Sequence, residues 1–358
     1  MDKVLYLTNL KLKESSGEMT HIVGVINSFI KKNFDIDLIT FETNEKLLRK
    51  RNLSNKVNIL KIDYKINNLI SSLFLFFRFY FLNKKKYKYI YIRESFLCLL
   101  LIPYLLTTKK KVIFEINGIR VFEEKRFLKS QIIKLSKFLT NILFKKSYKI
   151  IAVSEGIRDF LKDTYHIKNV YTVHNGTDLK PKNFTDKKDD SLIFIGNLSK
   201  WQNFNLLIKS IKLHKDYFEN NKISISIYGD GEEKERIINN INNNQLDNII
   251  LIKGKINKEL IIDVLLKSKI GLLIDTRFYK KELLFSPLKY FEYQVAQIPS
   301  IMLVEENVYL NKLKFDNLLV STPDTFLENI KELFSKNDLN FKIRNWDIVV
   351  DEILNIVE

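Results

Sequence analysis

The segment SPLKYFEY, Ser286–Tyr293, carries residue types that can hold a phosphate group at the start of a helix. Ser286 is predicted to cap this helix and Pro287 to be its first residue, because a serine hydroxyl accepts from helix-start amides and proline lacks one. The amides of Leu288 and Lys289 would then point out of the helix, where the dipole and the lysine charge favour an anion. An ordinary capped helix with a solvent-facing lysine is the alternative interpretation.

Glycine turns and one glutamate could complete a nucleotide site. One helical turn further on, Glu292 is placed to accept hydrogen bonds from ribose hydroxyls. The turns GNLSKW (Gly196–Trp201) and YGDGEE (Tyr228–Glu233) follow apolar runs and would let a ligand approach the backbone closely. A weaker signal is Gly17 in ESSGEMTH, also before a predicted helix. Each glycine equally fits a simple turn between strand and helix.

Short β-branched runs alternate with longer amphipathic stretches along the chain, which is typical of doubly wound parallel sheets. Helices are expected at Thr20–Lys32 and Ser130–Phe144. Strands are expected at Val4–Leu7, Asp37–Thr40, Tyr89–Ile92, Val112–Glu115, Ile150–Val153, Val170–Val173, Leu192–Ile195, Ile223–Tyr228, Ile249–Ile252 and Ile270–Ile274. Ligands of such sheets bind beyond the carboxyl ends of the strands, where the candidate turns lie.

The chain of 358 residues is long enough for two domains. The polar stretch Leu179–Ser191, which ends in the charge run Asp186–Asp190, is the predicted linker. We therefore predict an α/β fold with two Rossmann-like domains, 1–180 and 181–340, that face each other across a cleft. The stretch 341–358 has apolar residues at helical spacing and is predicted to pack back on the first domain.

The net charge of +17 favours anionic partners such as nucleotide phosphates, acidic glycans or an anionic membrane surface. Lysines on solvated faces explain the same composition equally well. A nucleic-acid-binding protein is disfavoured, because no zinc-ligand spacing, basic helix or aromatic nucleic-acid signature is present. The single cysteine, Cys98, excludes an intrachain disulfide and a cysteine-based metal site, which suits a cytoplasmic protein.

No apolar run reaches the length of a spanning helix, about 18–20 residues. The nearest, Leu69–Leu82 and Phe96–Leu106, are interrupted by Arg78 and Pro103 and predict core or interfacial helices. The N-terminal MDKVLYLTNL predicts a strand rather than a signal peptide. Aromatic and basic residues in Phe74–Lys88 could meet a lipid-linked or anionic glycan at the inner face of a membrane. A core helix followed by solvated lysines fits this stretch equally well.

Five ordered segments resemble glycosyltransferase family 4, and the resemblance is best between Ile150 and Ile301. The segments are IIAVSEGIRDFL (Ile150–Leu161), VHNGTD (Val173–Asp178), LIFIGNLSKWQNFNLLIKSI (Leu192–Ile211), ISIYGDGEE (Ile225–Glu233) and SPLKYFEYQVAQIPSI (Ser286–Ile301). The resemblance implies a GT-B fold and a nucleotide diphosphate sugar donor, with UDP as the preferred nucleotide. It also implies retention at the anomeric carbon, no required metal or other cofactor, and a cell-surface glycan acceptor.

The resemblance further implies roles for single residues. The donor-binding residues would be Gly17, Gly196, Asn197, Lys200, Gly229, Asp230, Ser286, Pro287, Leu288, Lys289 and Glu292, with His21 on the helix beyond Gly17. The catalytic candidates are Glu282, Asn117 and Lys289. The residues after first-domain strands that are expected to face the acceptor are Arg93, Glu94, Glu115 and Arg120.

The chain departs from the family pattern at carboxylate and histidine positions. Leu284 stands eight residues before Glu292, where the family often has a glutamate, so Glu282 is predicted to supply that carboxylate. Asn117 stands where the family has a histidine, and an amide can hydrogen-bond a sugar hydroxyl but cannot carry a proton.

A further departure concerns the cations around the diphosphate. Asn197 and Gln202 stand where the family often has arginine and lysine, so Lys200 or Lys289 is predicted to neutralise the phosphates. Glycosyl transfer needs charge stabilisation on the leaving diphosphate more than a strong base. A catalytically inactive glycan-binding or partner subunit on the same fold is the alternative function, and a nucleotide-sugar epimerase is another.

Overall fold

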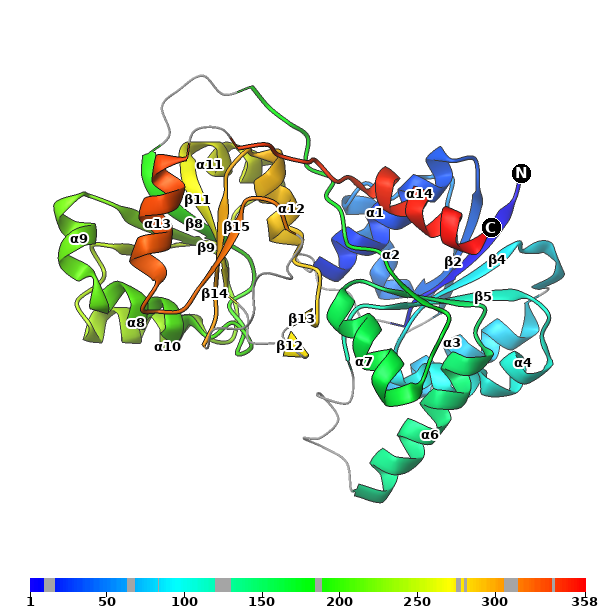
Figure 1. Cartoon of the computed structure of the whole chain (residues 1–358). Helices are drawn as coiled ribbons and strands as arrows, with labels where there is room; N and C mark the ends of the chain where they lie inside the picture. Colours follow the sequence, from blue (N-terminus) through cyan, green and yellow to red (C-terminus); the bar gives the residue numbers. More distant parts are fainter. Residues whose placement is uncertain are drawn as a thin grey trace. The chain divides into compact units, whose positions relative to one another are not determined.

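The computed structural model describes the chain in two compact units (Figure 1). The described residues are 1–9, 17–62, 68–82, 84–119, 130–183, 189–274, 278–279, 282–305, 315–336 and 339–358. Unit 1 comprises Met1–Asp178, Leu283–Ser286 and Asn345–Glu358, and unit 2 comprises Leu179–Glu282 and Pro287–Arg344. The return of Leu283–Ser286 to unit 1 is a feature that the boundaries expected from the sequence do not contain.

Unit 1 is built on a seven-stranded parallel sheet with the order β3-β2-β1-β4-β5-β6-β7. Its strands are β1 (Lys3–Leu7), β2 (Asp35–Phe41), β3 (Asn58–Ile62), β4 (Tyr89–Arg93), β5 (Lys111–Ile116), β6 (Lys149–Ala152) and β7 (Val170–Thr172). The central strands are buried on both faces: every residue of β4 is buried, as are the last four of β1. Such continuous apolar strands require helices on both sides of the sheet.

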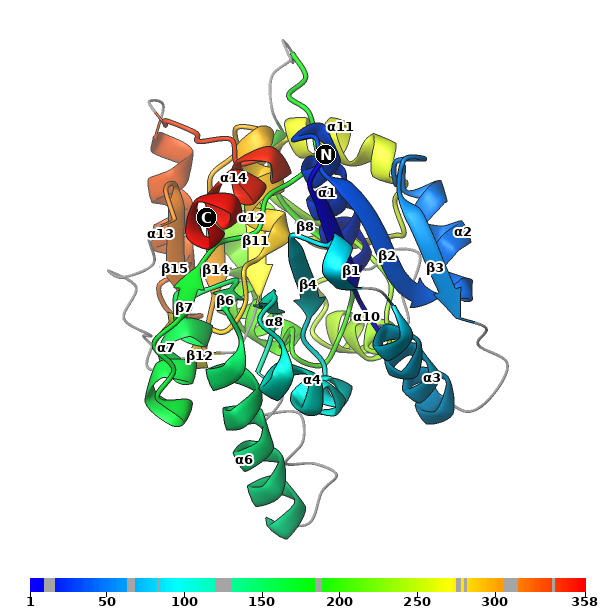
Figure 2. The ribbon, with the colours of Figure 1, turned by 90° about the vertical axis from the view of Figure 1, so that its right-hand side faces the viewer.

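Helices cover both faces of this sheet. They are α1 (Gly17–Lys31), α2 (Glu42–Lys50), α3 (Asn68–Phe81), α4 (Ile102–Thr107), α6 (Ser130–Lys146), α7 (Glu155–Tyr165) and α14 (Trp346–Val357), with 3-10 turns η1 (Lys84–Lys86) and η2 (Phe96–Leu101). Figures 1 and 2 show α1, α2 and α14 on one face and α3, α4, α6 and α7 on the other.

Helix α14 packs on α1, the helix that follows β1. The indole of Trp346 lies directly over Gly24, where a Cβ atom would overlap the ring. Lys31 Nζ lies 2.9 Å from Asp347 Oδ2 and ties the two helices at their exposed edge. The first and last helices of the chain are therefore neighbours within unit 1.

Unit 2 contains a six-stranded parallel sheet with the order β10-β9-β8-β11-β14-β15. Its strands are β8 (Asp189–Ile195), β9 (Ser224–Tyr228), β10 (Ile250–Gly254), β11 (Ser268–Ile274), β14 (Ser300–Leu303) and β15 (Leu318–Ser321), and β12 (Phe278–Tyr279) pairs with β13 (Glu282–Leu283) in a separate ribbon. Numbered within the unit, this is the dinucleotide-binding order 3-2-1-4-5-6, which reverses direction between β8 and β11.

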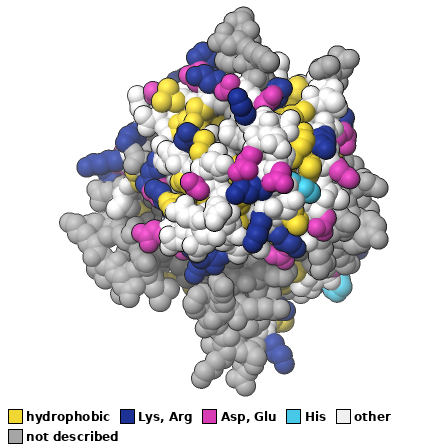
Figure 3. Space-filling model, turned by 90° about the vertical axis from the view of Figure 1, so that its left-hand side faces the viewer, with side chains coloured by type: hydrophobic (Ala, Val, Ile, Leu, Met, Phe, Trp, Pro, Cys, Tyr) yellow, Lys and Arg dark blue, Asp and Glu magenta, His cyan; other side chains and the backbone are white. Residues whose placement is uncertain are grey.

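The helices of unit 2 connect these strands. They are α8 (Phe204–Leu213), α9 (Lys215–Asn220), α10 (Lys234–Asn243), α11 (Ile261–Lys267), α12 (Leu288–Val295) and α13 (Phe326–Ser335), with the 3-10 turn η3 (Lys258–Leu260). A continuous apolar core joins α8, α9, α10 and α13 to the sheet, with Phe194, Phe218 and Ile225 fully buried. The outer face of the unit carries basic and acidic side chains interspersed (Figure 3).

The two parallel sheets confirm the predicted fold class. All ten predicted strands are present with shifted ends, whereas β3, β14 and β15 were not predicted. The predicted linker was wrong at its end, because Asp189–Ser191 already belong to β8. Asp189 and Asp190 are exposed at the start of that strand, where carboxylates stay hydrated. Residues 184–188 of the linker lie outside the described residues.

The two long apolar runs form helical segments of unit 1. Leu69–Leu82 corresponds to α3, and Phe96–Leu106 to η2 followed by α4. Within the described ranges, no helix combines the length and the apolarity needed to cross a bilayer.

Helix α12 is held against the sheet of unit 2 at a glycine, which gives a test of its position. Tyr293 packs on Gly271 of β11, and its hydroxyl donates to the Leu272 carbonyl at 2.9 Å. We expect Gly271→Ala to lower the free energy of unfolding by about 1–3 kcal/mol, because the new methyl group overlaps the ring. Denaturant unfolding measures this loss.

Gly118→Ala is the matched control for this substitution. A Cβ atom at Gly118 would meet no atom within 4 Å, so the change should stay within about 0.5 kcal/mol. Adding Tyr293→Leu to Gly271→Ala should recover part of the loss caused by the methyl group. Equal effects of the two alanine substitutions would contradict the packing described for α12.

Candidate functional site

Two glycine turns lie back to back at the carboxyl ends of β8 and β9 in unit 2. The Gly196 amide donates to the Tyr228 carbonyl at 2.9 Å, and the Leu198 amide donates to the Asp230 carbonyl at 2.9 Å. A Cβ atom at Gly229 would overlap the Gly196 carbonyl oxygen, and Gly196 has a φ of +151°, so neither position tolerates a side chain without strain. The structure thus brings these predicted donor-binding positions together, next to the point where the strand order reverses.

Lys289 extends from α12 to the Gly196 turn. A Cβ atom at Gly196 would overlap Lys289 Cε, and the Nζ atom lies 4.4 Å from the centroid of the Phe194 ring. With its amide nitrogen turned toward the Asn197 carbonyl, Gln202 accepts from Lys289 Nζ at 2.8 Å. The positive charge of Lys289 therefore lies beside the turn where the family often has other cations. The ring of Phe194 and the amide oxygen of Gln202 hold the ammonium group there.

The start of α12 differs from the prediction. Pro287, with φ −71° and ψ 111°, occupies the cap position without a side-chain cap, and the helix begins at Leu288. Ser286 does not cap α12, because its hydroxyl accepts the Asn175 amide within unit 1 at 2.9 Å. The first amides of the helix, at Leu288 and Lys289, keep the orientation that favours an anion.

The two carboxylates that are predicted to contact the donor lie on α12 and β13. Glu292 is half-buried on α12, one turn after its start. Leu284 is buried and apolar, so it cannot substitute for a glutamate. Glu282 is half-buried on β13, two residues earlier. Their roles in ribose binding and catalysis stay predictions.

The remaining predicted donor residues of unit 2 are on its two turns. Asp230 is paired with Lys255 at 3.4 Å and with Lys234 at 3.8 Å. The Gly231 amide, followed by these lysines, holds the pKa of Asp230 below its usual range. Asn197 donates to the Ser199 hydroxyl, and Lys200 is exposed. A nucleotide would meet an ionised, partly neutralised carboxylate beside the second turn.

In unit 1 the predicted acceptor residue Glu115 is 1 % exposed on β5. Its Oε1 atom lies 2.7 Å from His21 Nε2 and accepts from Asn117 Nδ2 at 2.5 Å, and its Oε2 accepts from the Tyr91 hydroxyl at 2.5 Å. Burial alone would raise the pKa of Glu115, but His21, Arg93 and Asn117 lower it from 4.5 to about 2. Glu115 is therefore a buried anion that positions its neighbours.

Arg93, another predicted acceptor residue, is 5 % exposed and lies 3.5 Å from the same carboxylate. Burial raises the pKa of both Tyr6 and Tyr91, whose rings stack beside this pair at 5.2 Å. The structure therefore replaces the acceptor-facing role expected for Arg93 and Glu115 with a buried ion pair. The sequence did not reveal this pair, because its two residues come from different strands, β4 and β5, and local spacing does not show which strand residues meet.

Of the other predicted residues of unit 1, Asn117 and Glu94 contact Glu115. Asn117 is half-buried and its amide points to Glu115, and the Glu94 amide donates to the Glu115 carbonyl at 2.9 Å. Gly17 is exposed and opens α1. Arg120 lies outside the described residues. The catalytic role of Asn117 and the acceptor role of Glu94 stay predictions.

Asn175 is a site residue to which the sequence assigned no role. Its Oδ1 lies 2.8 Å from His21 Nδ1, and its Nδ2 donates to the Ser286 carbonyl at 2.8 Å. Thr177, two residues on, forms a parallel bridge with Asn345. The segments where the chain leaves and re-enters unit 1 are thus joined to one another and to the buried carboxylate. The VHNGTD motif was the available signal, although no local spacing reveals these partners.

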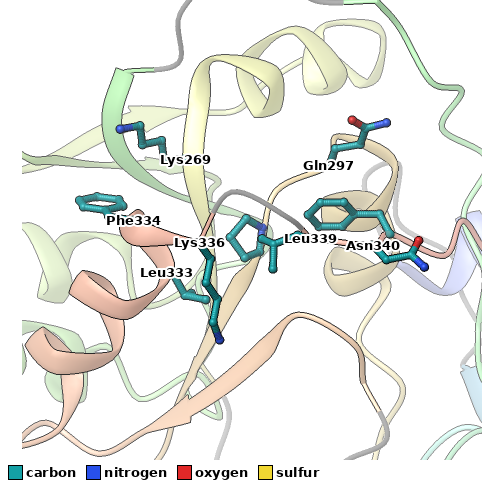
Figure 4. Close-up of a pocket in the computed structure, with 9 residues that line it drawn as sticks. Lys269, Gln297, Leu333, Phe334, Lys336, Leu339 and Asn340 are labelled. Atoms are coloured by element: carbon teal, nitrogen blue, oxygen red, sulfur yellow. The ribbon is translucent and has the colours of Figure 1, made fainter.

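A separate pocket of about 550 Å³ lies in unit 2 at the amino ends of β11 and β14 (Figure 4). Its lining includes Lys269, Phe334 and Lys336, and none of the predicted site residues. Lys269 is paired with Asp190, and Lys336 with Glu332. This pocket is at the opposite end of the strands from the glycine turns, so we assign it no part in the site.

No cluster of three or more His, Cys, Asp or Glu side chains suited to a metal ion occurs among the residues that the structure describes. That the reaction requires no metal stays a prediction.

Two family models match adjoining parts of the chain. "Glycosyltransferase Family 4" matches residues 16–181, and "Glycosyl transferases group 1" matches residues 175–276. The chain is a GT-B glycosyltransferase of the family 4 type. A search of curated proteins finds no match. The resemblance drawn from the sequence is confirmed, and the second model covers both glycine turns of this glycosyltransferase.

Solved structures share its fold. A TarM mutant from S. aureus in complex with fondaparinux, alpha-GlcNAc-glycerol and UDP has a TM-score of 0.70 at 11% identity, and 100% of each chain is covered. HepE from Anabaena in complex with UDP has a TM-score of 0.67 at 12% identity, and the match covers 100% of this chain and 97% of HepE. The lipopolysaccharide outer core galactosyltransferase WaaB has a TM-score of 0.63 at 13% identity, and the match covers 100% of this chain and 96% of WaaB. At this identity the likeness shows the fold alone.

The buried carboxylate predicts an acid-dependent loss of stability. Because the pKa of Glu115 is lower in the folded chain than its ordinary 4.5, its charge stabilises the fold above about pH 4.5, and this contribution is lost as the pH falls toward 2. We expect Glu115→Gln to cost about 3–5 kcal/mol at pH 7, since Arg93 loses its buried counter-charge. Urea unfolding should show that the difference in the free energy of unfolding between wild type and Glu115→Gln becomes smaller as the pH falls from 5 to 3.

Glu328→Gln, an exposed change on α13, is the control. If Glu115→Gln does not fold, Asn117→Ala tests the same carboxylate by removing one hydrogen bond, and acid unfolding should then move to higher pH. A pH-independent gap for Glu115→Gln, or an unchanged acid transition for Asn117→Ala, would contradict the ionised state of Glu115.

Proposed function

We propose that this glycosyltransferase moves a sugar from a nucleotide diphosphate donor, with UDP preferred, to a cell-surface glycan such as capsule or lipopolysaccharide. The observation that carries the proposal is the convergence of the Gly196 turn with Lys289 and the start of α12 in unit 2. Oriented amides with one fixed cation match the charge that develops on a leaving diphosphate. HepE and TarM, of the same fold, are in complex with UDP, and WaaB is named for a lipopolysaccharide substrate.

We also propose retention at the anomeric carbon without a metal. In such a reaction the protein supplies charge stabilisation, and the leaving phosphate can take the proton of the acceptor hydroxyl. Asn117 then needs only to hydrogen-bond a sugar hydroxyl, which its amide can do, and Glu282 would contact the donor sugar. ¹H NMR of the first-formed product distinguishes retention from inversion.

The location we propose is cytoplasmic, with a peripheral position on the inner face of the membrane. A nucleotide-sugar donor and a lipid-linked or surface glycan acceptor would meet there. The part of the surface that would contact the membrane is treated in the next subsection.

A panel of UDP, GDP, ADP and CMP tests the donor site. We expect UDP alone to raise the unfolding temperature, because a ligand at 100 times its dissociation constant adds about 2.7 kcal/mol of stability. The shift should be lost in Glu292→Ala, whose carboxylate is proposed to hold the ribose. Thermal unfolding at millimolar nucleotide measures both results.

Glu328→Ala, an exposed glutamate on another helix of unit 2, should keep the full shift. A shift with a different nucleoside diphosphate would keep the site and change the base. The proposal fails if no nucleotide stabilises the wild-type chain, or if Glu292→Ala responds to UDP as the wild type does.

A further inference from the structure

Helix α3 of unit 1 is apolar on both sides, NLISSLFLFFRFYF, although only one side is buried. The buried residues are Leu75, Phe76 and Phe79. On the opposite side Phe74, Phe77 and Phe81 are 56%, 60% and 73% exposed, and Leu73 and Tyr80 extend the same stripe. A helix with apolar residues on every side is normally enclosed, so the exposed stripe indicates a partner that is not part of this chain's core.

The stripe continues onto the neighbouring helices of the same face. The Tyr80 hydroxyl donates to the Leu100 carbonyl at 2.7 Å and joins α3 to η2, and Figures 1 and 2 place α4 and α6 on the same face of the sheet. Nine of the fifteen large exposed hydrophobic side chains of the described chain lie here, and we name them the apolar face: Leu73, Phe74, Phe77, Tyr80, Phe81, Leu100, Leu106, Leu135 and Phe138.

The elements that carry the apolar face have charges of one sign, whereas α7, farther along the same face of the sheet, contains Glu155, Asp159 and Asp163. The elements α3, η1, η2, α4 and α6 contain no Asp or Glu. Their basic residues are Arg78, Lys84, Lys85, Lys86, Lys134, Lys137, Lys145 and Lys146. The face of unit 2 in Figure 3 differs, because its basic and acidic side chains are interspersed.

Lys84 shows how apolar and basic groups are combined here. Its Nζ atom lies 4.5 Å from the Phe79 ring centroid and 5.0 Å from that of Tyr104, and it donates to the Tyr80 carbonyl at 3.0 Å. The lysine thus closes the carboxyl end of α3 at the edge of the aromatic stripe. Aromatic rings flanked by lysines are the arrangement that enters the boundary between headgroups and acyl chains.

We propose that the apolar face docks unit 1 on an anionic lipid bilayer, with α3 lying in the interface. The positive charge of the elements that carry the apolar face selects this occupant, because it attracts anionic headgroups while two copies of these elements would repel each other. The 14-residue α3 lies on the membrane rather than spanning it. The inference rests on the proposed function only for its consequence, that the transferase meets a membrane-held acceptor.

Vesicle flotation tests the docking without any substrate. We expect the chain to float with vesicles of phosphatidylcholine and phosphatidylglycerol, and not with phosphatidylcholine alone, and to be released by high salt. Phe74→Ser, Phe77→Ser and Phe81→Ser combined should lower the partition coefficient at least tenfold. Leu213→Ser with Leu260→Ser, 52% and 51% exposed in unit 2, is the matched control and should leave it unchanged.

Charge reversal provides a second variant that leaves the aromatic residues in place. Lys134→Glu, Lys145→Glu and Lys146→Glu lie at exposed positions of α6 and should also abolish flotation. An unchanged UDP-induced thermal shift in either variant shows that the donor site is intact, so a failed donor test and failed docking are separate results.

Three outcomes would overturn the docking proposal. The first is that the wild type fails to bind the anionic vesicles, and the second is that both variants float as the wild type does. The third is that sedimentation shows a dimer that the serine substitutions dissociate, which would make a second copy the occupant of the apolar face.

Discussion

The close approach of two backbones at the ends of β8 and β9 is the constraint on which the site in unit 2 depends. Gly229 has no room for a side chain, because the Gly196 carbonyl oxygen occupies the space where its Cβ would be. The same lack of a side chain at Gly196 lets Lys289 lie across the turn. Helix α12 can carry that lysine there because Tyr293 packs on Gly271 and fixes the helix on β11. Three glycines thus place one cation and one helix start at the strand-order reversal.

Unit 1 is organised around a buried charge instead. Glu115 draws together groups from α1, β4 and the turn after β5, because an isolated carboxylate at that depth would be very costly. Through His21 the network reaches Asn175, and through Asn175 it reaches Ser286. The segments at which the chain leaves and re-enters the unit are therefore anchored to this buried carboxylate.

Much of the fold could be predicted from the sequence, because central strands such as β1 and β11 are uninterrupted apolar runs. The edge strand β15 was missed, because it has only four residues and three of them are half-buried. The glycine turns and Lys289 were predictable from residue type and order. The partners of Ser286 and Glu115 were not, because Asn175 lies 111 positions from Ser286 and Tyr91 and His21 come from other elements. Local spacing carries no information on such tertiary contacts.

A crystal structure of the chain with UDP tests the central claim most directly. The account predicts the diphosphate within hydrogen-bond distance of Lys289 Nζ and of the first amides of α12, with the nucleotide against the Gly196 and Gly229 turns. UDP bound elsewhere in unit 2, such as the pocket at the amino ends of β11 and β14, with Lys289 still covered by Phe194 and Gln202, would contradict it.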